Sequence, residues 1–344
     1  MRKQGPILIA AAGMFALAAC SSGLQNSNSS LPTTGASQSA MRSSATRTGI
    51  LPSLIAKLDL VRSLAHRNRA PARPAKAAKY LYVDDVALNE VLLFSSKTYA
   101  NSGNTITDGI DCPDGNWADK SGNVYVANCN GASITEYSSS GSLVYTYTTG
   151  IDDPVEVTTD KNGNVYEADY NVDVSGGGFV NEYAQQSNTV SETCATGGNV
   201  EGVAVDKHGD VFVYQNLSGG GADIVEYVHG LSGCNGTTLS PTFDFAGGLV
   251  LDSQANLIAV DQAAEAVDVI APPYTSITST LGSGWVVPFH ATINKKNTLA
   301  YVADYGDGDV QVIDYPSGTS VATIGSSGGL EFPVSAVNYA NYVP

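Results

Sequence analysis

From residue 80 to the end of the chain, hydrophobic positions come in short runs that alternate with polar positions and are rich in Val, Ile and Tyr. This period of two, with β-branched and aromatic residues, is typical of β-strands. Between consecutive runs lies a short polar string of the form Asp-x-x-Gly-Asn, which predicts a tight hairpin turn. The pattern therefore predicts an all-β domain over residues 80–344.

The turn string and the strand after it recur along the chain. The copies begin at Asp119, Asp160, Asp206, Asp252 and Asn294, which are 41, 46, 46 and 42 residues apart. A second apolar run follows each of them, for example residues 134–137 in the first copy. A period in this range is typical of β-propellers and leaves room for four antiparallel strands in each repeat.

A sixth copy is split between the two ends of this region. Residues 81–85 and 91–94 match its later strands, and residues 332–338 match its first strand. Pairing strands from both ends in one sheet removes exposed edges and makes opening of a ring costly. We therefore predict a six-bladed β-propeller of four-stranded antiparallel blades, with the C-terminal strand innermost in the shared blade. A β-helix or an open solenoid is the alternative, and neither would need complementary ends.

The copies resemble the NHL repeat family, whose pattern is a Pro-x-Gly start, the Asp-x-x-Gly-Asn turn and a strand reading Tyr-Val-Ala-Asp. The residues that carry the resemblance are Pro113, Gly115, Asp119, Gly122, Asn123, Tyr125, Val126, Ala127 and Asn128. The copies at Asp252 and Asn294 depart from the pattern because they lack the turn glycine. The resemblance implies a propeller that binds a ligand or a protein. The related gluconolactonase-type propellers imply a second possibility, a metal-dependent lactonase.

The first twenty residues form an export signal. Met1-Arg2-Lys3 is basic, residues 6–16 are apolar, and Leu17-Ala18-Ala19-Cys20 follows. The apolar run is too short to span a membrane. The last four residues resemble the lipobox of bacterial lipoproteins, which implies cleavage before Cys20 and lipidation of its thiol. Ser21 then favours the outer membrane, if the host has one. An ordinary secretory signal with an incidental Cys20 is the alternative.

Two further segments precede the propeller. Residues 21–50 are rich in Ser and poor in large apolar residues, so we expect a flexible tether. Residues 51–79 begin with apolar positions at helical spacing and continue with basic residues among Ala and Pro, which predicts a basic amphipathic helix and linker. This stretch would contact anionic lipid headgroups or the acidic domain, unless it is only a solvated spacer.

Charge is distributed unevenly between these parts. Residues 1–79 contain eleven Lys and Arg against one acid, whereas residues 80–344 contain six Lys, no Arg and 32 acids, a balance of −26. Arg and Lys supply most contacts to nucleic-acid phosphates. We therefore expect no nucleic-acid partner, and instead an unidentified protein, glycan or small molecule.

Four cysteines remain after Cys20, an even number in an exported chain, so we expect disulfides. Cys112 precedes a first strand and Cys129 follows a second strand in the same copy, at the same face of the ring. We predict a Cys112–Cys129 pair and, by elimination, Cys194–Cys234. The second pair is the weaker inference, because Cys234 is expected in a loop at the opposite face.

Candidate chemistry lies at the start of the innermost strands, where polar residues surround the central channel. They are Asp114, Glu156, Glu201 and His290, at or next to positions that are Gly in other copies. Carboxylates with one imidazole suit Ca²⁺ or another divalent cation, which could polarise a lactone carbonyl. We therefore take all four as candidate ligand-binding residues, three of them (Asp114, Glu156 and Glu201) as candidate metal ligands, and Glu156, Glu201 and His290 as candidate catalytic residues. A solvated acidic rim or a structural ion is the simpler alternative.

A second polar set ends the second strand of each copy. Side chains there can accept hydrogen bonds from the turn that follows, which explains their recurrence without a catalytic role. The set comprises Asp85, Asn128, Asp169, Gln215, Asp261 and Asp304. The sequence as a whole favours an envelope-anchored binding or scaffold module over the alternative of a metal-dependent hydrolase.

Overall fold

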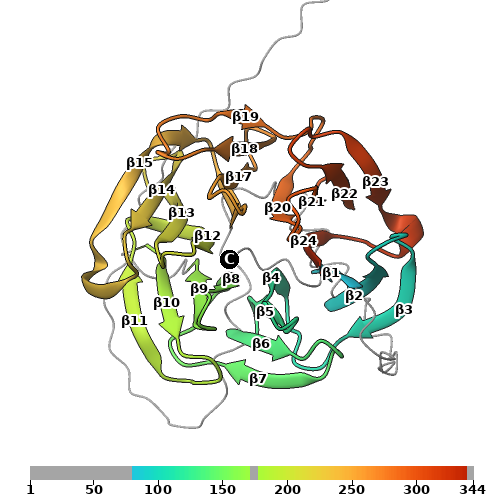
Figure 1. Cartoon of the computed structure of the whole chain (residues 1–344). Coiled ribbons are helices and arrows are strands. Elements are labelled where there is room, and N and C mark those ends of the chain that lie inside the picture. The colour runs from blue at the N-terminus through green and yellow to red at the C-terminus, as the bar shows by residue number, and fades with distance from the viewer. Residues whose placement is uncertain (1–79, 171–176, 339–344) are drawn as a thin grey trace, which may run out of the picture. The chain divides into compact units, whose positions relative to one another are not determined.

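The computed structural model describes residues 80–170 and 177–338. They form 24 strands arranged in six four-stranded antiparallel sheets. The sheets stand around a central axis like the blades of a propeller (Figure 1). The predicted six-bladed β-propeller is confirmed. The signal peptide, tether and helix predicted for residues 1–79 lie outside the described residues.

Each blade has an inner strand next to the axis and three strands in order outward. Blade 1 is β24 (Pro333–Asn338), β1 (Tyr80–Asp85), β2 (Glu90–Ser95) and β3 (Asn101–Ile106). Blade 2 is β4 (Pro113–Ala118), β5 (Val124–Asn128), β6 (Ser133–Tyr137) and β7 (Leu143–Tyr147). Blade 3 is β8 (Pro154–Thr159), β9 (Val165–Asp169), β10 (Phe179–Tyr183) and β11 (Val190–Ala195). Blade 4 is β12 (Gly198–Val205), β13 (Val211–Leu217), β14 (Ala222–Tyr227) and β15 (Gly236–Phe243). Blade 5 is β16 (Ala246–Leu251), β17 (Leu257–Asp261), β18 (Ala266–Ile270) and β19 (Ser279–Thr280). Blade 6 is β20 (Pro288–Ile293), β21 (Leu299–Asp304), β22 (Asp309–Asp314) and β23 (Ser320–Ile324). Two short 3₁₀ helices are η2 (Ser232–Cys234) and η3 (Ser326–Gly328).

Blade 1 is built from both ends of the described chain. The C-terminal strand β24 pairs antiparallel with β1, with Tyr82 opposite Val337 and Asp84 opposite Ser335. It is the innermost strand of the blade, as the sequence predicted. Its pairing leaves β1 with a partner on both sides, so the ring closes through backbone hydrogen bonds.

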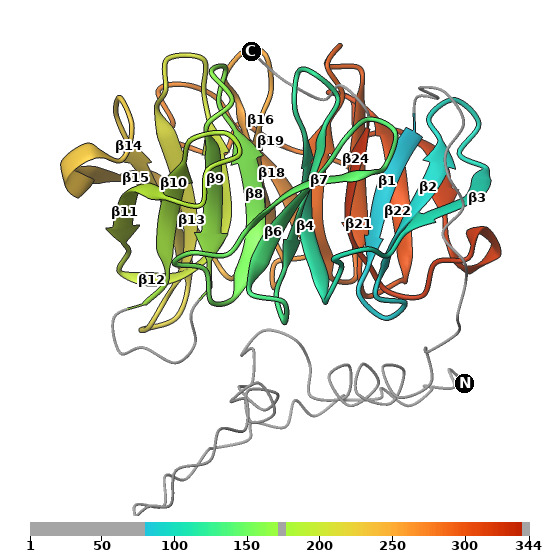
Figure 2. The same cartoon turned by 90° about the horizontal axis from the view of Figure 1, so that it is seen from below.

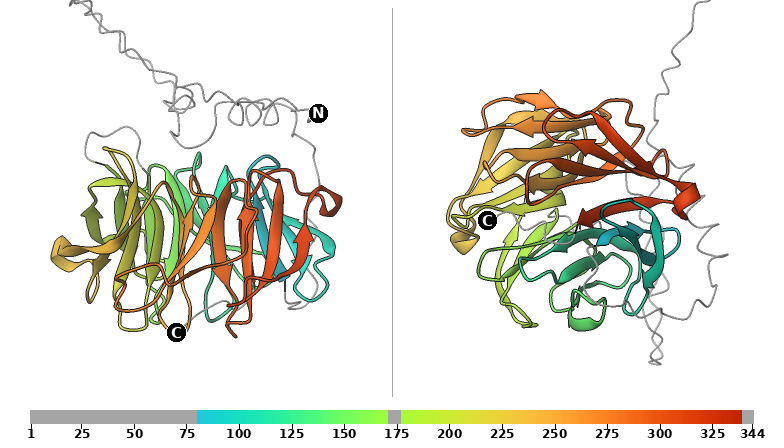
Figure 3. Two further views of the ribbon diagram at one scale, coloured as in Figure 1. Left: turned by 90° about the horizontal axis from the view of Figure 1, so that it is seen from above. Right: turned by 45° about the vertical axis from the view of Figure 1, so that its right-hand side comes forward.

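The propeller has two faces, seen edge on in Figure 2 and in the left view of Figure 3. We call the face with the turns between first and second strands the turn face. The opposite face carries the connections from one blade to the next, and we call it the crossover face. Inner strands therefore run from the crossover face to the turn face.

The repeated turn owes its shape to its first residue. In the blade 2 copy, Asp119 Oδ1 accepts the backbone N–H groups of Ser121 and Asn123, both at 2.8 Å. Gly122 then adopts a left-handed conformation with φ of 85°, which glycine reaches without steric penalty. The two copies that lack this glycine keep the same geometry, because Ala255 and Asn297 take φ of 62° and 52°. The departure from the repeat pattern therefore leaves the fold unchanged.

The polar set that ends the second strands fixes the connections between blades. Asp261 is representative, because its carboxylate accepts the N–H groups of Asp244 and Phe245 at 2.7 and 3.0 Å, just before the inner strand of the same blade. It also accepts the N–H of Ala264 in the turn that follows, at 3.0 Å. The structural role expected from the sequence is confirmed, and it extends to the connection that enters each blade.

Apolar clusters fill the spaces between neighbouring blades. One of them joins Trp117 and Tyr125 of blade 2 to Val157 of blade 3, and all three side chains are buried. Among the residues that the structure describes, no helix is long and apolar enough to cross a membrane.

Candidate functional site

The four inner-strand residues singled out from the sequence are all buried at the centre of the ring. Asp114 lies on β4, Glu156 on β8, Glu201 on β12 and His290 on β20. Three of them meet, and we call Asp114, Glu156 and His290 the central ion group. Glu201 is not part of it. The Glu201 Oε1 atom instead accepts a hydrogen bond from Asn216 Nδ2 at 3.4 Å, within its own blade.

His290 occupies the middle of this group. Its Nε2 lies 3.8 Å from Asp114 Oδ1, and its Nδ1 lies 3.4 Å from Glu156 Oε1. Space for the ring comes from two glycines on other inner strands. A Cβ on Gly248 would overlap His290 Nδ1, and one on Gly115 would lie 3.2 Å from His290 Cε1. The glycines of the repeat therefore admit a side chain that crosses the channel.

The central ion group holds a proton on His290. Burial alone lowers the pKa of this imidazole, but the hydrogen bonds and negative charges of Asp114 and Glu156 outweigh burial and raise it to about 10. Each ring nitrogen faces a carboxylate oxygen at ion-pair distance, and the imidazolium is the form that carries a hydrogen on both nitrogens. An internal cation therefore sits between the two carboxylates at neutral pH.

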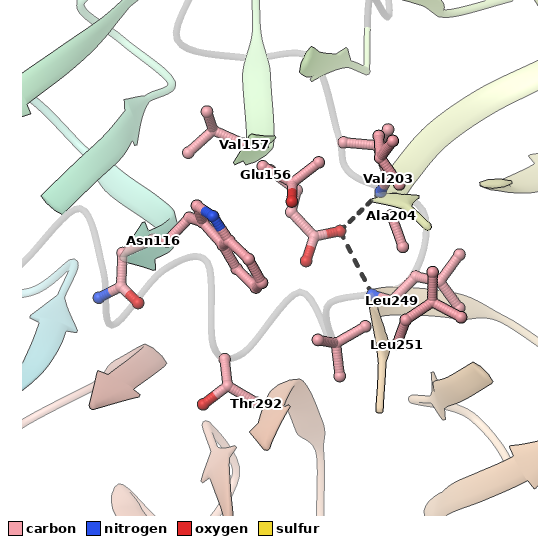
Figure 4. Close-up of a pocket in the computed structure, with 12 residues that line it drawn as sticks. Asn116, Glu156, Val157, Val203, Ala204, Leu249, Leu251 and Thr292 are labelled. Carbon is pink, nitrogen blue, oxygen red and sulfur yellow. Dashed lines mark hydrogen bonds between the residues drawn. The ribbon is translucent and has the colours of Figure 1, made fainter. Parts of the chain in front are cut away.

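Glu156 connects the group to further blades. Its Oε2 accepts the backbone N–H of Val203 at 2.7 Å and that of Leu249 at 3.3 Å (Figure 4). Val203 lies on β12 and Leu249 on β16, so this one carboxylate contacts blades 4 and 5 as well as His290 of blade 6. Because each partner comes from a different blade, the group ties the blades together across the axis.

A second polar cluster joins blades 1 and 2 and was missed by the sequence reasoning. Asn116 donates from Nδ2 to Asp84 Oδ1 at 2.8 Å, and Ser335 Oγ donates to Asn116 Oδ1 at 3.1 Å. Burial raises the pKa of Asp84 well above its usual value, although Asn116 and the charge of His290 oppose the rise. Two consecutive acids, Asp84 and Asp85, end β1 and could have indicated this cluster. Only Asp85 belongs to the repeated polar set, so Asp84 was not singled out.

The pocket beside Glu156 is small. A pocket lined by Glu156, Asn116, Thr292 and apolar side chains (Figure 4) has a cavity volume of about 10 Å³. That is roughly the space of one water molecule. This pocket therefore has no room for a substrate of lactone size beside Glu156.

The residues also do not fit the divalent cation expected from the sequence. His290 already supplies the positive charge between Asp114 and Glu156, and Glu201 points to Asn216. In residues 80–170 and 177–338, no group of three or more His, Cys, Asp or Glu side chains is arranged to hold a metal ion. We derive no metal-dependent step from this site.

Both predicted disulfides are formed. Cys112 and Cys129 have a Cα–Cα distance of 5.2 Å, and Cys194 and Cys234 one of 5.4 Å, within the usual range for a disulfide. The second pair spans two blades, because Cys194 lies on β11 and Cys234 in the β14–β15 connection. The β14–β15 connection lies against β11, the outer strand of blade 3. Cys234 therefore reaches Cys194, although the sequence predicted Cys234 in a loop at the opposite face.

Comparisons with known proteins support the architecture alone. No family model matches the chain, and no curated protein matches it. Among solved structures, a chain in the crystal structure of a nidogen/laminin complex aligns with a TM-score of 0.61 at 15% identity. A protein of unknown function from Bacteroides caccae aligns with a TM-score of 0.58 at 12% identity. Each alignment covers 76% of this chain and 99% of the other chain. At this level of identity the likeness extends to the fold, and the chain is a six-bladed β-propeller whose ring is closed by its own C-terminal strand.

Proposed function

We propose that this protein is an exported, lipid-anchored propeller of NHL-like type that acts as a binding or scaffold module in the cell envelope. The observation that carries the proposal is the closed centre of the ring. His290, Asp114 and Glu156 contact one another at the centre, and the pocket beside Glu156 has a cavity volume of about 10 Å³, so we expect recognition at the outer surfaces of a rigid scaffold. Its partner would be a protein, a glycan or a small ligand.

Two features support the envelope location. The Leu17-Ala18-Ala19-Cys20 string follows a basic and apolar start, and the propeller contains two disulfides. Disulfides persist mainly in oxidising, extracytoplasmic compartments. In a host with two membranes, Ser21 favours attachment to the outer one.

The alternative of a metal-dependent lactonase has less support. It requires several carboxylates open to a cation and a substrate, whereas Glu156 is occupied by two backbone N–H groups and by His290. Glu201 lies outside the group. The same side chains act here as internal structural contacts.

Replacement Cys20→Ser tests the anchor. We expect the full chain to move from the membrane fraction to the soluble fraction after export, because a lipidated cysteine is then missing. Circular dichroism of the two forms should agree. Full retention of the Cys20→Ser chain on membranes would contradict lipid anchoring and would instead favour the basic segment at residues 51–79 as the anchor.

Lactone hydrolysis assays of the wild type and of Glu156→Gln test the binding role against hydrolysis. We expect no lactone hydrolysis above background, with or without added Ca²⁺. Hydrolysis that a chelator abolishes, and that Glu156→Gln also abolishes, would overturn the assignment as a binding module.

A further inference from the structure

Blade 3 contains a buried acid where the other repeats have an apolar residue. Glu167 occupies the middle of β9, and the corresponding positions in blades 2, 4, 5 and 6 are Val126, Val213, Ala259 and Val302. Two residues later comes Asp169, which points to the same face of the strand because side chains alternate. Both carboxyl groups are fully buried, with 0% exposure.

Each of the two acids uses only one of its oxygen atoms. Glu167 Oε2 accepts Asn181 Nδ2 at 3.0 Å. Asp169 Oδ2 accepts the backbone N–H of Asp152 at 2.7 Å and that of Asp153 at 3.2 Å. The other two atoms, Glu167 Oε1 and Asp169 Oδ1, are buried and have no hydrogen-bond partner among the residues that the structure describes. Since a buried oxygen without a partner is costly, the pair calls for a hydrogen that both atoms can share.

Within residues 80–170 and 177–338, no positive charge acts on the pair. The titratable groups that interact with the pair are Asp152 and Asp153 of the β7–β8 connection and Tyr183 of β10. Two ionised carboxylates in one buried site repel each other, so one of them keeps its proton. A metal ion is a poor substitute, because the described part of the chain has no cluster of three or more potential ligands.

The expected ionisation agrees with this geometry. Burial raises the pKa of Asp169 to about 7, although its bonds to the N–H groups of Asp152 and Asp153 oppose the rise. Burial also raises the pKa of Glu167 well above its usual value, and the adjacent charge of Asp169 raises it further.

We propose that Glu167 and Asp169 share a single proton, held between Glu167 Oε1 and Asp169 Oδ1, and that this proton latches the connection from blade 2 to blade 3. Asp169 holds that connection through two N–H groups, while Asn181 donates to Gly150 O at 2.9 Å and Tyr183 donates to Thr149 O at 2.8 Å. Loss of the proton to solvent leaves two charges beside Asp152 and Asp153. The contacts that hold the β7–β8 connection therefore weaken as the pH rises, which makes this connection a pH-sensitive segment of the crossover face.

The test is amide hydrogen exchange at Asp152 and Asp153 in the full chain, between pH 6 and pH 9. In the wild type, protection corrected for the intrinsic rate should fall by about tenfold per pH unit while the closed pair still holds its proton, since opening is then linked to release of one proton, and should level off once the closed pair has lost that proton. In Glu167→Gln the side-chain amide donates to Asp169 and only Asp169 still titrates, so the loss of protection should end near pH 7, the pKa to which burial raises Asp169. Glu192→Gln, on β11 of the same blade, removes a carboxyl outside the pair and should follow the wild type.

Two outcomes would overturn the proposal. One is an identical pH profile for the wild type and Glu167→Gln. The other is a loss of protection on addition of a chelator at pH 6, which would place a cation rather than a proton between the two acids. Should Glu167→Gln not fold, Asp169→Asn gives the same test, because its amide oxygen accepts from the connection and its amide nitrogen donates to Glu167.

Discussion

His290 carries a positive charge at the centre of a domain whose balance is −26. The imidazolium is 3% exposed and lies between carboxylates from two other blades. Removing water from such charges is expensive, and the arrangement is stable only while every partner is present. The charge on this single side chain therefore stabilises the contacts between blades 2, 3 and 6.

Replacement His290→Gln should lower the free energy of unfolding by about 3 kcal/mol at pH 6, because it leaves two buried carboxylates without their cation. The folded-state pKa of about 10 lies above the unfolded value of 6.5. The stabilisation from the imidazolium is thus fully present below about pH 6.5 and is lost as the pH rises through 10. Urea unfolding of both proteins from pH 6 to 10.5 measures this.

The gap in stability between the wild type and His290→Gln should therefore narrow with rising pH. A gap that is the same at pH 6 and pH 10.5 would show that His290 is neutral in the folded state. Replacement His208→Gln, in an exposed turn, removes a histidine away from the centre and should leave the wild-type profile unchanged.

The spacing of the repeats predicts that His290 lies beside the channel, but it does not predict which side chains His290 contacts. The repeat register fixes which residue begins each inner strand, so Asp114, Glu156, Glu201 and His290 were all expected at the centre. Which of them meet depends on side-chain packing, since His290 reaches across only because Gly115 and Gly248 leave it room. Glu201 instead accepts a hydrogen bond from Asn216 of its own blade. The repeat register alone does not predict that contact.

At the scale of single elements, the second strand of each blade ends in a residue that fixes the incoming connection. Asp261 accepts three backbone N–H groups, those of Asp244, Phe245 and Ala264. These N–H groups belong to segments that lack strand partners, so the carboxylate replaces a missing part of the backbone hydrogen bonding. The same position explains why acids and amides recur there.

Replacement Asp261→Ala should lower the free energy of unfolding by about 2 kcal/mol, because three N–H groups lose a charged acceptor. Asp244→Ala is the matched control, since the Asp244 side chain is exposed and its loss should change stability by no more than about 0.5 kcal/mol. Chemical unfolding of the two variants measures the difference. Equal effects would contradict a specific role for the second-strand residue.

At the scale of the whole molecule, the fold followed from the repeat and the site did not. The turn string and the split sixth copy together predicted six blades and an innermost C-terminal strand, because strand period and ring closure are backbone properties. The Glu167 and Asp169 pair was not predicted, although Glu167 breaks the apolar pattern set by Val126 and Val302. A single polar residue within an apolar strand shows its role only when its buried partners are known.

The closed ring is the central claim, and one truncation tests it most directly. A chain ending at Phe332 lacks β24, so β1 loses its inner partner and Asn116 loses Ser335. A chain ending at Asn338 retains β24 and serves as the control. Thermal unfolding of both should show the cooperative transition of the wild type only in the control, with the shorter chain unfolding at least about 10 °C lower or without a transition. An unchanged melting temperature for the chain ending at Phe332 would contradict closure of the propeller through its C-terminal strand.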